Sequence, residues 1–446
     1  MLLAAEKARL TKFCRESGAA WLEQHRYTDA TSADTREVAL SAHILSELEE
    51  LLAQQRALYR DLHLHPELSM QEHQTAERIE AELGKLDVEV QRIGGTGVVA
   101  VLSNGDGPSV LARADIDALP LSEQTGLDYA SQADGVMHAC GHDMHVATLL
   151  GAVKVLASNT DSWAGTYIAV FQPGEETAAG AQAMLDDGFV DKVPRPDVAL
   201  AQHVMPTEAG TIGTSAGPVL SAGDSLKITV HGQGAHGSMP HNSIDPVVLA
   251  SSIVLQLQTI VSRETQPGEF AVVTVGALNA GTTSNIIPDR AELLLNLRTY
   301  DDAVRRRVMA SIERIVHGAC QAAGSPKQPE FEYYDQFPLT DNDATVNATV
   351  TDAFTDFFGS DAVYETAPYT ASEDFSRLPD AFGIPYTYWV IGSVAPEKYR
   401  RALAEGTVAQ EIPANHSPAF APEIDPTLEI GIQTQVVAAL AYLAAS

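Results

Sequence analysis

Apolar residues recur along the chain at two spacings, and these predict where helices and strands lie. At helical spacing they occupy 40–52, 75–83 and 428–445, so we expect helices there and a mostly helical stretch from residue 1 to about 84. Short runs rich in Val and Ile, bounded by Gly, Asn or Pro, predict strands at 88–93, 98–102, 110–114, 166–171 and 198–201. The pattern is that of an α/β protein.

The pattern changes in the middle of the chain. Between about 224 and 332 it predicts a strand, a helix, two strands, a helix and a strand, at 225–231, 246–264, 270–278, 290–297, 302–322 and 330–333. This β-α-β-β-α-β order predicts a ferredoxin-like α+β domain inserted into the larger one. We therefore expect one domain from 1–222 with 336–446, and a second from 223–335.

Polar side chains follow three of the apolar runs. Asp115 and Asp117 come after 110–114, the pair Glu175 and Glu176 comes after 166–171, and His203 comes after 198–201. Adjacent carboxylates at the end of a buried strand are costly unless a cation lies nearby. Ligands bind at the carboxyl ends of the strands in an α/β sheet, so we expect a metal site at this edge.

The densest group of candidate ligands is residues 137–145, Met-His-Ala-Cys-Gly-His-Asp-Met-His. Cys140 and His142 are two apart with Gly141 between them, and an apolar helical pattern follows, which predicts a strand-to-helix junction with His142 and His145 near the first helical turn. A thiolate beside an imidazole suits zinc or a similar transition metal better than calcium or magnesium. The alternative to a metal site is that these histidines and the cysteine are ordinary packed or solvated side chains.

Other polar residues are assigned less directly. His63 and His65, in a polar turn before Pro66, are expected to be structural. The stretch 371–375 is interpreted as an acidic turn, and His416 is the last candidate ligand. An imidazole, an amide and a guanidinium in the inserted domain could grip a carboxylate or polarise a carbonyl; these belong to His236, Asn285 and Arg298.

Charge and composition exclude several classes of function. The chain has 446 residues, 45% of them hydrophobic, and a net charge of −31, which disfavours binding to nucleic acid or an anionic membrane. Cys14, Cys140 and Cys320 are too few for a disulfide framework, which favours a cytoplasmic protein. We find no secretory signal and no uninterrupted apolar run of about twenty residues, so no membrane span is expected.

Taken in order, these motifs resemble the M20 metallopeptidase family, in the amidohydrolase branch that contains hippurate hydrolases, indole-3-acetyl-amino-acid hydrolases and N-acyl-amino-acid aminoacylases. The resemblance extends from about Arg60 to the C-terminus, and implies a zinc-peptidase-like catalytic domain with a mixed sheet flanked by helices, plus the inserted domain. It rests on Arg113-Ala-Asp-Ile-Asp-Ala-Leu-Pro, His138-Ala-Cys-Gly-His-Asp-Met-His, Gln172-Pro-Gly-Glu-Glu, Gln202-His-Val, Gly234-Ala-His-Gly-Ser, Ser284-Asn-Ile-Ile-Pro-Asp, Ser372-Glu-Asp-Phe and His416-Ser-Pro.

The resemblance also implies roles for individual residues. Glu175 would act as the general base that activates the attacking water, and Asp117 would orient a ligand. Asp115 stands at the position where other branches of the family carry a metal-binding histidine. In this branch Cys140 takes over that histidine's role as a ligand. One or two divalent ions, zinc or else manganese, cobalt or nickel, would be held by Cys140, His142, Glu176, His203 and His416.

The implied reaction is hydrolysis of an N-acyl amino acid to a carboxylic acid and a free amino acid. The inserted domain would form a homodimer, His236 would reach the partner's active site as an oxyanion donor, and Asn285 and Arg298 would bind the substrate's free carboxylate. The stretches 64–73 and 260–264 further resemble bacterial aminoacylases, including some that cleave acyl-glutamine conjugates. A dipeptidase or carboxypeptidase of this family, and a non-catalytic binding protein on the same fold, remain alternatives.

Overall fold

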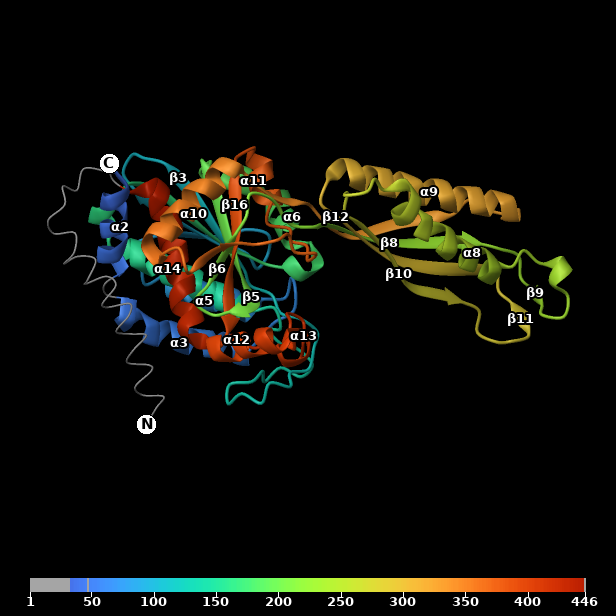
Figure 1. The fold of residues 1–446 in the computed structure, drawn as a ribbon, viewed down its shortest axis with the longest axis horizontal. Coiled ribbons are helices and arrows are strands. Elements are labelled where there is room, and N and C mark those ends of the chain that lie inside the picture. The colour runs from blue at the N-terminus through green and yellow to red at the C-terminus, as the bar shows by residue number, and fades with distance from the viewer. Residues whose placement is uncertain (1–32, 46–47, 445–446) are drawn as a thin grey trace.

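A mixed eight-stranded sheet forms the centre of the larger part of the molecule (Figure 1). The computed structural model describes residues 33–45 and 48–444. Strands β3, β4, β5 and β16 are parallel to one another, whereas β2 is antiparallel to β4 and β6 is antiparallel to β16. In spatial order the strands are β1 (Glu89–Arg92), β2 (Val98–Asn104), β4 (Gly165–Gln172), β3 (Ser109–Asp115), β5 (Val198–Glu208), β16 (Tyr386–Val394), β6 (Ile212–Thr214) and β15 (Val363–Glu365).

Helices cover both faces of this sheet because its strands alternate apolar side chains between two cores. Along β2, Val98 and Ala100 face one core and Val99 and Val101 face the other. The first core is closed by α2 (Ala33–Ile44), α3 (Leu48–Leu64), α4 (His73–Leu83), α5 (His142–Ser158), α10 (Ala344–Phe358) and α14 (Ile424–Leu443), and the second by α6 (Gly180–Asp186), α7 (Phe189–Lys192) and α11 (Arg377–Phe382).

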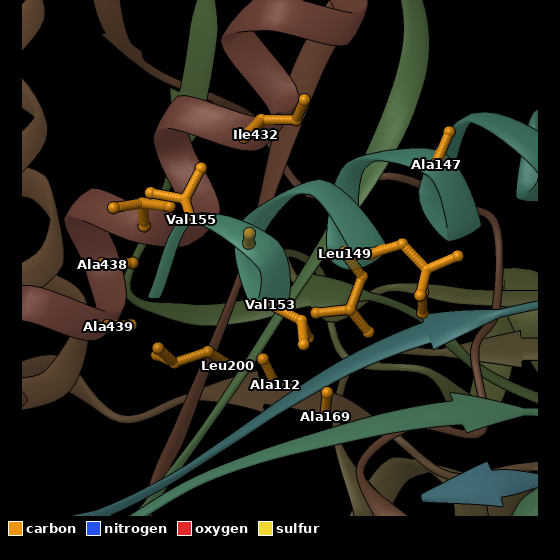
Figure 2. Packing of buried hydrophobic residues seen from close by; sticks show 14 of the residues in the cluster. Ala112, Ala147, Leu149, Val153, Val155, Ala169, Leu200, Ile432, Ala438 and Ala439 are labelled. Carbon is orange, nitrogen blue, oxygen red and sulfur yellow. The ribbon is translucent and has the colours of Figure 1, made fainter. Parts of the chain in front are cut away.

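Helix α5 is buried from His142 to Leu156, which fixes the position of its first turn. Figure 2 shows Leu149 and Val153 of α5 above the small side chains of Ala112 and Ala169 on the sheet. On the other side α5 meets α14, where a Cβ at Gly151 would lie 2.7 Å from Ile432 Cδ1. Small residues on the sheet and on α5 itself thus let α5 approach both neighbours closely, and well-packed contacts of this kind leave a helix little freedom to shift.

A second, four-stranded antiparallel sheet projects from the first (Figure 1). Alternate residues of its strands point toward two helices on one face, which form a separate core with them. The elements follow the predicted β-α-β-β-α-β order: β8 (Ala222–His231), α8 (Pro246–Thr259), β10 (Ala271–Ala280), β12 (Arg290–Thr299), α9 (Asp302–Ala323) and β13 (Glu330–Phe337). A short pair, β9 (Ala235–His236) and β11 (Ile286–Ile287), lies at its far end.

Shorter elements complete the description. They are β7 (Gly217–Leu220), β14 (Thr340–Asn342), α12 (Pro396–Glu405), α13 (Val408–Glu411), the single turns η2 (Thr160–Ser162), η3 (Glu175–Thr177) and η4 (Pro240–Asn242), and the π-helical turn η5 (Ile260–Glu264).

The predicted mixed α/β fold is confirmed, but three local predictions were wrong. Strand β5 continues to Glu208, so His203 lies within a strand and not after one, because β16 pairs with β5 beyond the point where β3 ends. Residues 138–141 form a loop and not a strand before α5. His63 lies in the last turn of α3 and is buried, since the helix runs on to Leu64 before Pro66. Cys14 and the predicted helical residues 1–32 lie outside the described residues.

One helical stretch in the described part of the chain, Pro246–Glu264, is long and apolar enough to cross a membrane by length and composition alone. It contains Ser251, Ser252 and Gln256, so it is not the uninterrupted apolar run whose absence we noted. A third of it is buried, with Leu249, Ile253 and Leu257 packed on the second sheet. Its opposite face is exposed and carries Val247, Val248, Leu255 and Val261 among polar side chains.

Candidate metal centre

Five predicted ligands meet at the carboxyl ends of the central strands. Cys140 Sγ lies 3.5 Å from His203 Nε2. Glu176 Oε1 lies 3.9 Å from His142 Nε2 and 3.3 Å from His416 Nε2, and Cys140, Glu176 and His416 have ligand atoms within 4.8 Å of one another. These contacts link the loop before α5, the turn after β4, strand β5 and the loop before α14 around one space.

Gly141 brings the cysteine and the histidine together. It has a φ of +86°, caps the N-terminus of α5 and touches β5, where a Cβ would collide with Val204 Cγ2. The chain can therefore turn sharply between Cys140 and His142 while lying directly against the strand that carries His203.

The adjacent carboxylates diverge, as two different roles would require. They form the short turn η3, which follows Gly174 at a φ of +54°. Glu176 faces His416 and His142. Glu175 is buried and has an oxygen within 4.8 Å of those of Glu373 and Asp374. Glu176 thus points into the ligand group, and Glu175 lies at its edge, with an oxygen within 4.8 Å of His142 and Glu176 as well.

The imidazoles are oriented by hydrogen bonds on their far side. His142 Nδ1 donates to Asp117 Oδ1 at 3.1 Å, and His203 Nδ1 donates to the carbonyl oxygen of Val204 at 2.7 Å. Each ring therefore keeps its Nε2 lone pair for the shared space, as metal-binding histidines do. His142 Nε2 and Glu176 Oε1 are buried without a hydrogen-bond partner. Such atoms are expensive to bury, and a cation between them would remove the cost, so these residues fit a metal ion.

A histidine with no predicted role supports this group from behind. His145 Nδ1 donates to Asp115 Oδ1 at 2.5 Å, and its Nε2 accepts the backbone N–H of Val204 at 2.9 Å. His145 thereby ties α5 to β5 beside His203. Its place in the first turn of α5, three residues after His142, was the signal in the sequence that pointed to it.

Behind Asp115, Arg113 is completely buried among acidic groups. It contacts Asp115 Oδ2 at 2.7 Å, Glu373 Oε1 at 2.8 Å and Asp374 Oδ1 at 3.3 Å. Burial opposes ionisation of Asp115, but His142, Arg113 and His145 together hold its pKa well below the usual range. Glu373 and Asp374 belong to the acidic turn that the sequence suggested, and both are buried against this arginine.

Electrostatics favour proton uptake by Glu175. Burial, followed by the nearby charges of Glu373 and Glu176, raises the pKa of the Glu175 carboxyl well above its usual value. A carboxylate in such surroundings is a stronger base than one in water.

The loop before α14 closes one side of the group. His416 has a φ of +67°, and its backbone N–H donates to the carbonyl oxygen of Ala139 at 2.8 Å. Asn415 Nδ2 donates to the carbonyl oxygens of Cys140 and Val204, at 3.3 and 3.2 Å. The His416 side chain is 54% exposed, so the centre opens to solvent on this side.

His63 lies outside the ligand group. Its Nδ1 contacts Asp143 Oδ2 at 2.6 Å and its Nε2 contacts Glu123 Oε1 at 3.3 Å. Burial opposes its protonation, but these carboxylates raise the pKa of His63 to about 9. A charged imidazole held in this way ties α3 to α5, while His65 contacts Asp61 on the surface.

The predicted oxyanion donor His236 and the predicted substrate-binding residues Asn285 and Arg298 do not meet at the centre within one chain. His236 and Asn285 are neighbours at the far end of the second sheet, where Gly237 N–H donates to the Asn285 carbonyl oxygen at 2.8 Å (Figure 1). Arg298 lies at the opposite end of β12, where its guanidinium donates to Ser372 Oγ and to Asn296 Oδ1. Only Arg298 is thus close to the residues of the larger part.

Comparison with known proteins agrees with the motifs. Residues 111–406 match the family model for peptidase family M20/M25/M40. Over 345 residues, 76% of this chain and 80% of the relative, the sequence is 40% identical to N-acetyl-L-cysteine deacetylase of Bacillus subtilis. It is 37% identical to thermostable carboxypeptidase 1 of Saccharolobus solfataricus, over 78% of this chain and 87% of the relative.

A solved structure has the same fold. The Bacillus subtilis YXEP protein, described as a dinuclear metal binding peptidase of the M20 family, superposes with a TM-score of 0.72 and 30% identity, over 88% of this chain and 98% of that one. Motifs, fold and sequence identity agree, and the chain belongs to peptidase family M20/M25/M40.

Proposed function

We propose that this protein is a metal-dependent amidohydrolase that cleaves N-acyl amino acids into a carboxylic acid and a free amino acid. The observation that carries the proposal is a buried carboxylate, Glu175, which has an oxygen within 4.8 Å of His142 and Glu176 and stands in addition to the five assigned ligands. A purely structural metal site would be closed by its own ligands and would need no such group. The similarity to N-acetyl-L-cysteine deacetylase supports the substrate class.

We assign the metal to the five side chains gathered at the strand ends. A bound divalent ion would act as a Lewis acid, polarising the scissile carbonyl and lowering the pKa of water. Zinc suits a thiolate with imidazoles, and manganese, cobalt and nickel also accept these ligands. The dinuclear description of the YXEP relative favours two ions. The ligands are Cys140, His142, Glu176, His203 and His416.

The residues of the chain carry the proton. Glu175 accepts a proton from the attacking water as the water oxygen bonds to the amide carbon. The C–N bond then breaks, and Glu175 returns the proton to the leaving nitrogen, so one water is consumed and a carboxylic acid and a free amine are released. Asp117 and the Val204 carbonyl keep the imidazoles in place during this cycle.

Replacing Cys140 with serine is expected to weaken metal binding. The variant retains a small side chain at the loop but replaces a soft thiolate with a hydroxyl, a poor ligand for zinc. We expect the metal content after dialysis to fall below that of the wild type while the melting temperature of the metal-free protein is unchanged. The matched control is Cys320→Ser, which makes the same change at a buried cysteine in the core of the second sheet. Equal metal retention in the Cys140 variant and the wild type would remove Cys140 from the ligands.

The second sheet supplies the remaining substrate contacts in this proposal. We take 1–222 with 336–446 as the catalytic domain and 223–335 as a domain that forms a homodimer. Helix α8 presents exposed Val248 and Leu255, 65% and 73% accessible, and β10 is an edge strand. In such a dimer His236 would stabilise the oxyanion in the partner's centre, and Asn285 and Arg298 would bind the free carboxylate of the substrate.

The substitution Leu255→Glu tests this dimer. A charge on the apolar face of α8 is expected to produce monomers in sedimentation or light scattering and to lower turnover together with dimer content, because His236 could no longer reach a second centre. Gln321→Glu, which adds the same charge to an exposed position of α9, should leave both unchanged. A fully active Leu255→Glu monomer would contradict the role given to His236.

The carboxypeptidase relative provides a second candidate function. The two functions differ in what lies on the amine side of the scissile bond. An assay of free leucine release separates the two functions. The substrates are N-acetyl-leucine, glycyl-leucine and a tripeptide ending in leucine, each at the same concentration. We expect preference for the acetyl compound. Preference for the peptides would support the carboxypeptidase, and release from none of them, with metal bound, would support a binding protein.

A further inference from the structure

Residues 67–72 run alongside both loops that carry the acidic groups of the centre, although they have no role in the mechanism above. The carbonyl oxygen of Glu67 accepts the N–H of Ala118 at 2.8 Å, and Leu68 forms a parallel bridge with the same residue. Ser69 Oγ donates to Asp117 Oδ2 at 2.7 Å. Residues 67–69 therefore hold the loop after β3, which contains Asp117 and Ala118, by hydrogen bonds.

At its other end, the segment places a buried carboxylate under the catalytic turn. Glu72 is fully buried, and its Oε1 accepts the N–H groups of Gly174 and Met70, each at 2.8 Å. Its Oε2 accepts Thr96 Oγ1 at 2.6 Å. A carboxyl group is costly to bury, and burial raises the pKa of Glu72, but three donors aimed at its oxygens offset that cost. An apolar residue would fill the space more cheaply, so the hydrogen bonds themselves need a reason.

The geometry of the turn supplies that reason. Gly174 is the residue before Glu175, and a Cβ there would lie 2.5 Å from Met70 Sδ. The turn η3 is three residues long and has no longer helix to stiffen it. At its other side the N–H of Glu176 donates to Asp117 Oδ2 at 3.0 Å. Two backbone hydrogen bonds, one to Glu72 and one to Asp117, thus bracket Glu175.

We propose that Glu72 is a positioning residue that fixes the Gly174–Glu176 turn, and so directs Glu175 toward the reacting atoms and Glu176 toward the other ligands. The catalytic part of this inference rests on the proposed function. A catalytic group misplaced by about 1 Å can cost about a hundredfold in rate, so loss of one buried acceptor has a measurable effect.

Hydrogen exchange tests the position of the turn without any turnover. In Glu72→Ala, amides of peptides that cover 173–178 are expected to exchange faster than in the wild type, while those of β4 are unchanged. Glu72→Gln should restore protection, because the amide oxygen can accept both N–H groups and the Thr96 hydroxyl can accept from the amide nitrogen. Unchanged exchange of 173–178 in Glu72→Ala overturns the proposal.

Kinetics test its consequence, if the wild type hydrolyses N-acyl amino acids. Glu72→Ala should lower kcat by about a hundredfold, with KM changed by less than about threefold, and Glu72→Gln should recover most of the loss. Thr96→Val, which removes only the contact to Oε2, should lower the melting temperature but not kcat. A kcat for Glu72→Ala within threefold of the wild type, or an equal loss in Thr96→Val, overturns the proposal. Should Glu72→Ala fail to fold, Glu72→Asp, shorter by one methylene, undergoes the same measurements with the same expectations.

The proposed function and the role of Glu72 can fail independently. A wild-type protein without activity would refute the proposed function, whereas hydrogen exchange of residues 173–178 would still decide whether Glu72 holds the turn.

Discussion

Glu175→Gln is expected to lower kcat by about a hundredfold or more while the protein keeps its metal, because glutamine has the same shape but cannot accept a proton. Its stability should not fall. Burial and then the charges of Glu373 and Glu176 raise the pKa of the Glu175 carboxyl, and a neutral amide removes both the cost of burying a charge and the repulsion. Steady-state kinetics on an N-acyl amino acid, metal analysis and thermal unfolding check the three parts of this prediction.

The neighbouring residue provides the matched control. Glu176→Gln makes the same chemical change one position along, but at the carboxylate that faces His142 and His416. Here we expect metal to be lost on dialysis along with activity. A Glu175→Gln enzyme with the full wild-type rate would show that another group moves the proton.

Arg113→Met is expected to have the largest effect on stability, a loss of about 3–5 kcal/mol in the free energy of unfolding or failure to fold. Methionine approximates the length of the arginine stem but leaves Asp115, Glu373 and Asp374 buried without their cation. Asp115 in turn holds His145, so the loss should extend to the metal centre. Urea unfolding of the metal-free proteins measures the difference.

A surface arginine calibrates this prediction. Arg400 is 69% exposed and paired with Glu208, and Arg400→Met should cost about 1 kcal/mol or less. Adding Glu373→Gln to Arg113→Met should recover part of the loss, because one uncompensated charge is removed. An Arg113→Met protein as stable as Arg400→Met would refute the account of this buried cluster.

The fold could be predicted from the chain because local patterns carry it. Strand β2 is an unbroken apolar run because both of its faces are buried, whereas β8 alternates apolar and polar residues because one face packs on a core, and both patterns were visible in the sequence. The end of β5 was not visible, since it depends on pairing with β16, which lies almost two hundred residues away in the sequence.

The ligand residues could be proposed because Cys, His and adjacent Glu are rare at the ends of apolar runs. Of the residues that hold these ligands, Asp117 was predicted and does contact His142, but the others could not be proposed. Arg113 lies within an apolar strand and Glu373 in a short polar stretch, and nothing in either segment tells that the two meet in the interior. Glu72 likewise reads as one of many surface glutamates until the fold places it under Gly174. The positions of Arg113, Glu373 and Glu72 are decided by contacts between segments that lie far apart in the sequence, and no local pattern reveals such contacts.

The central claim is that this centre hydrolyses N-acyl amino acids with the help of a divalent metal. Its most direct test is release of free amino acid from N-acetyl amino acids by metal-loaded protein, then after chelation with the loss of metal verified, and again after zinc or manganese is restored. We predict that release stops on chelation and returns with the metal. An unchanged rate in verified metal-free protein would contradict the account.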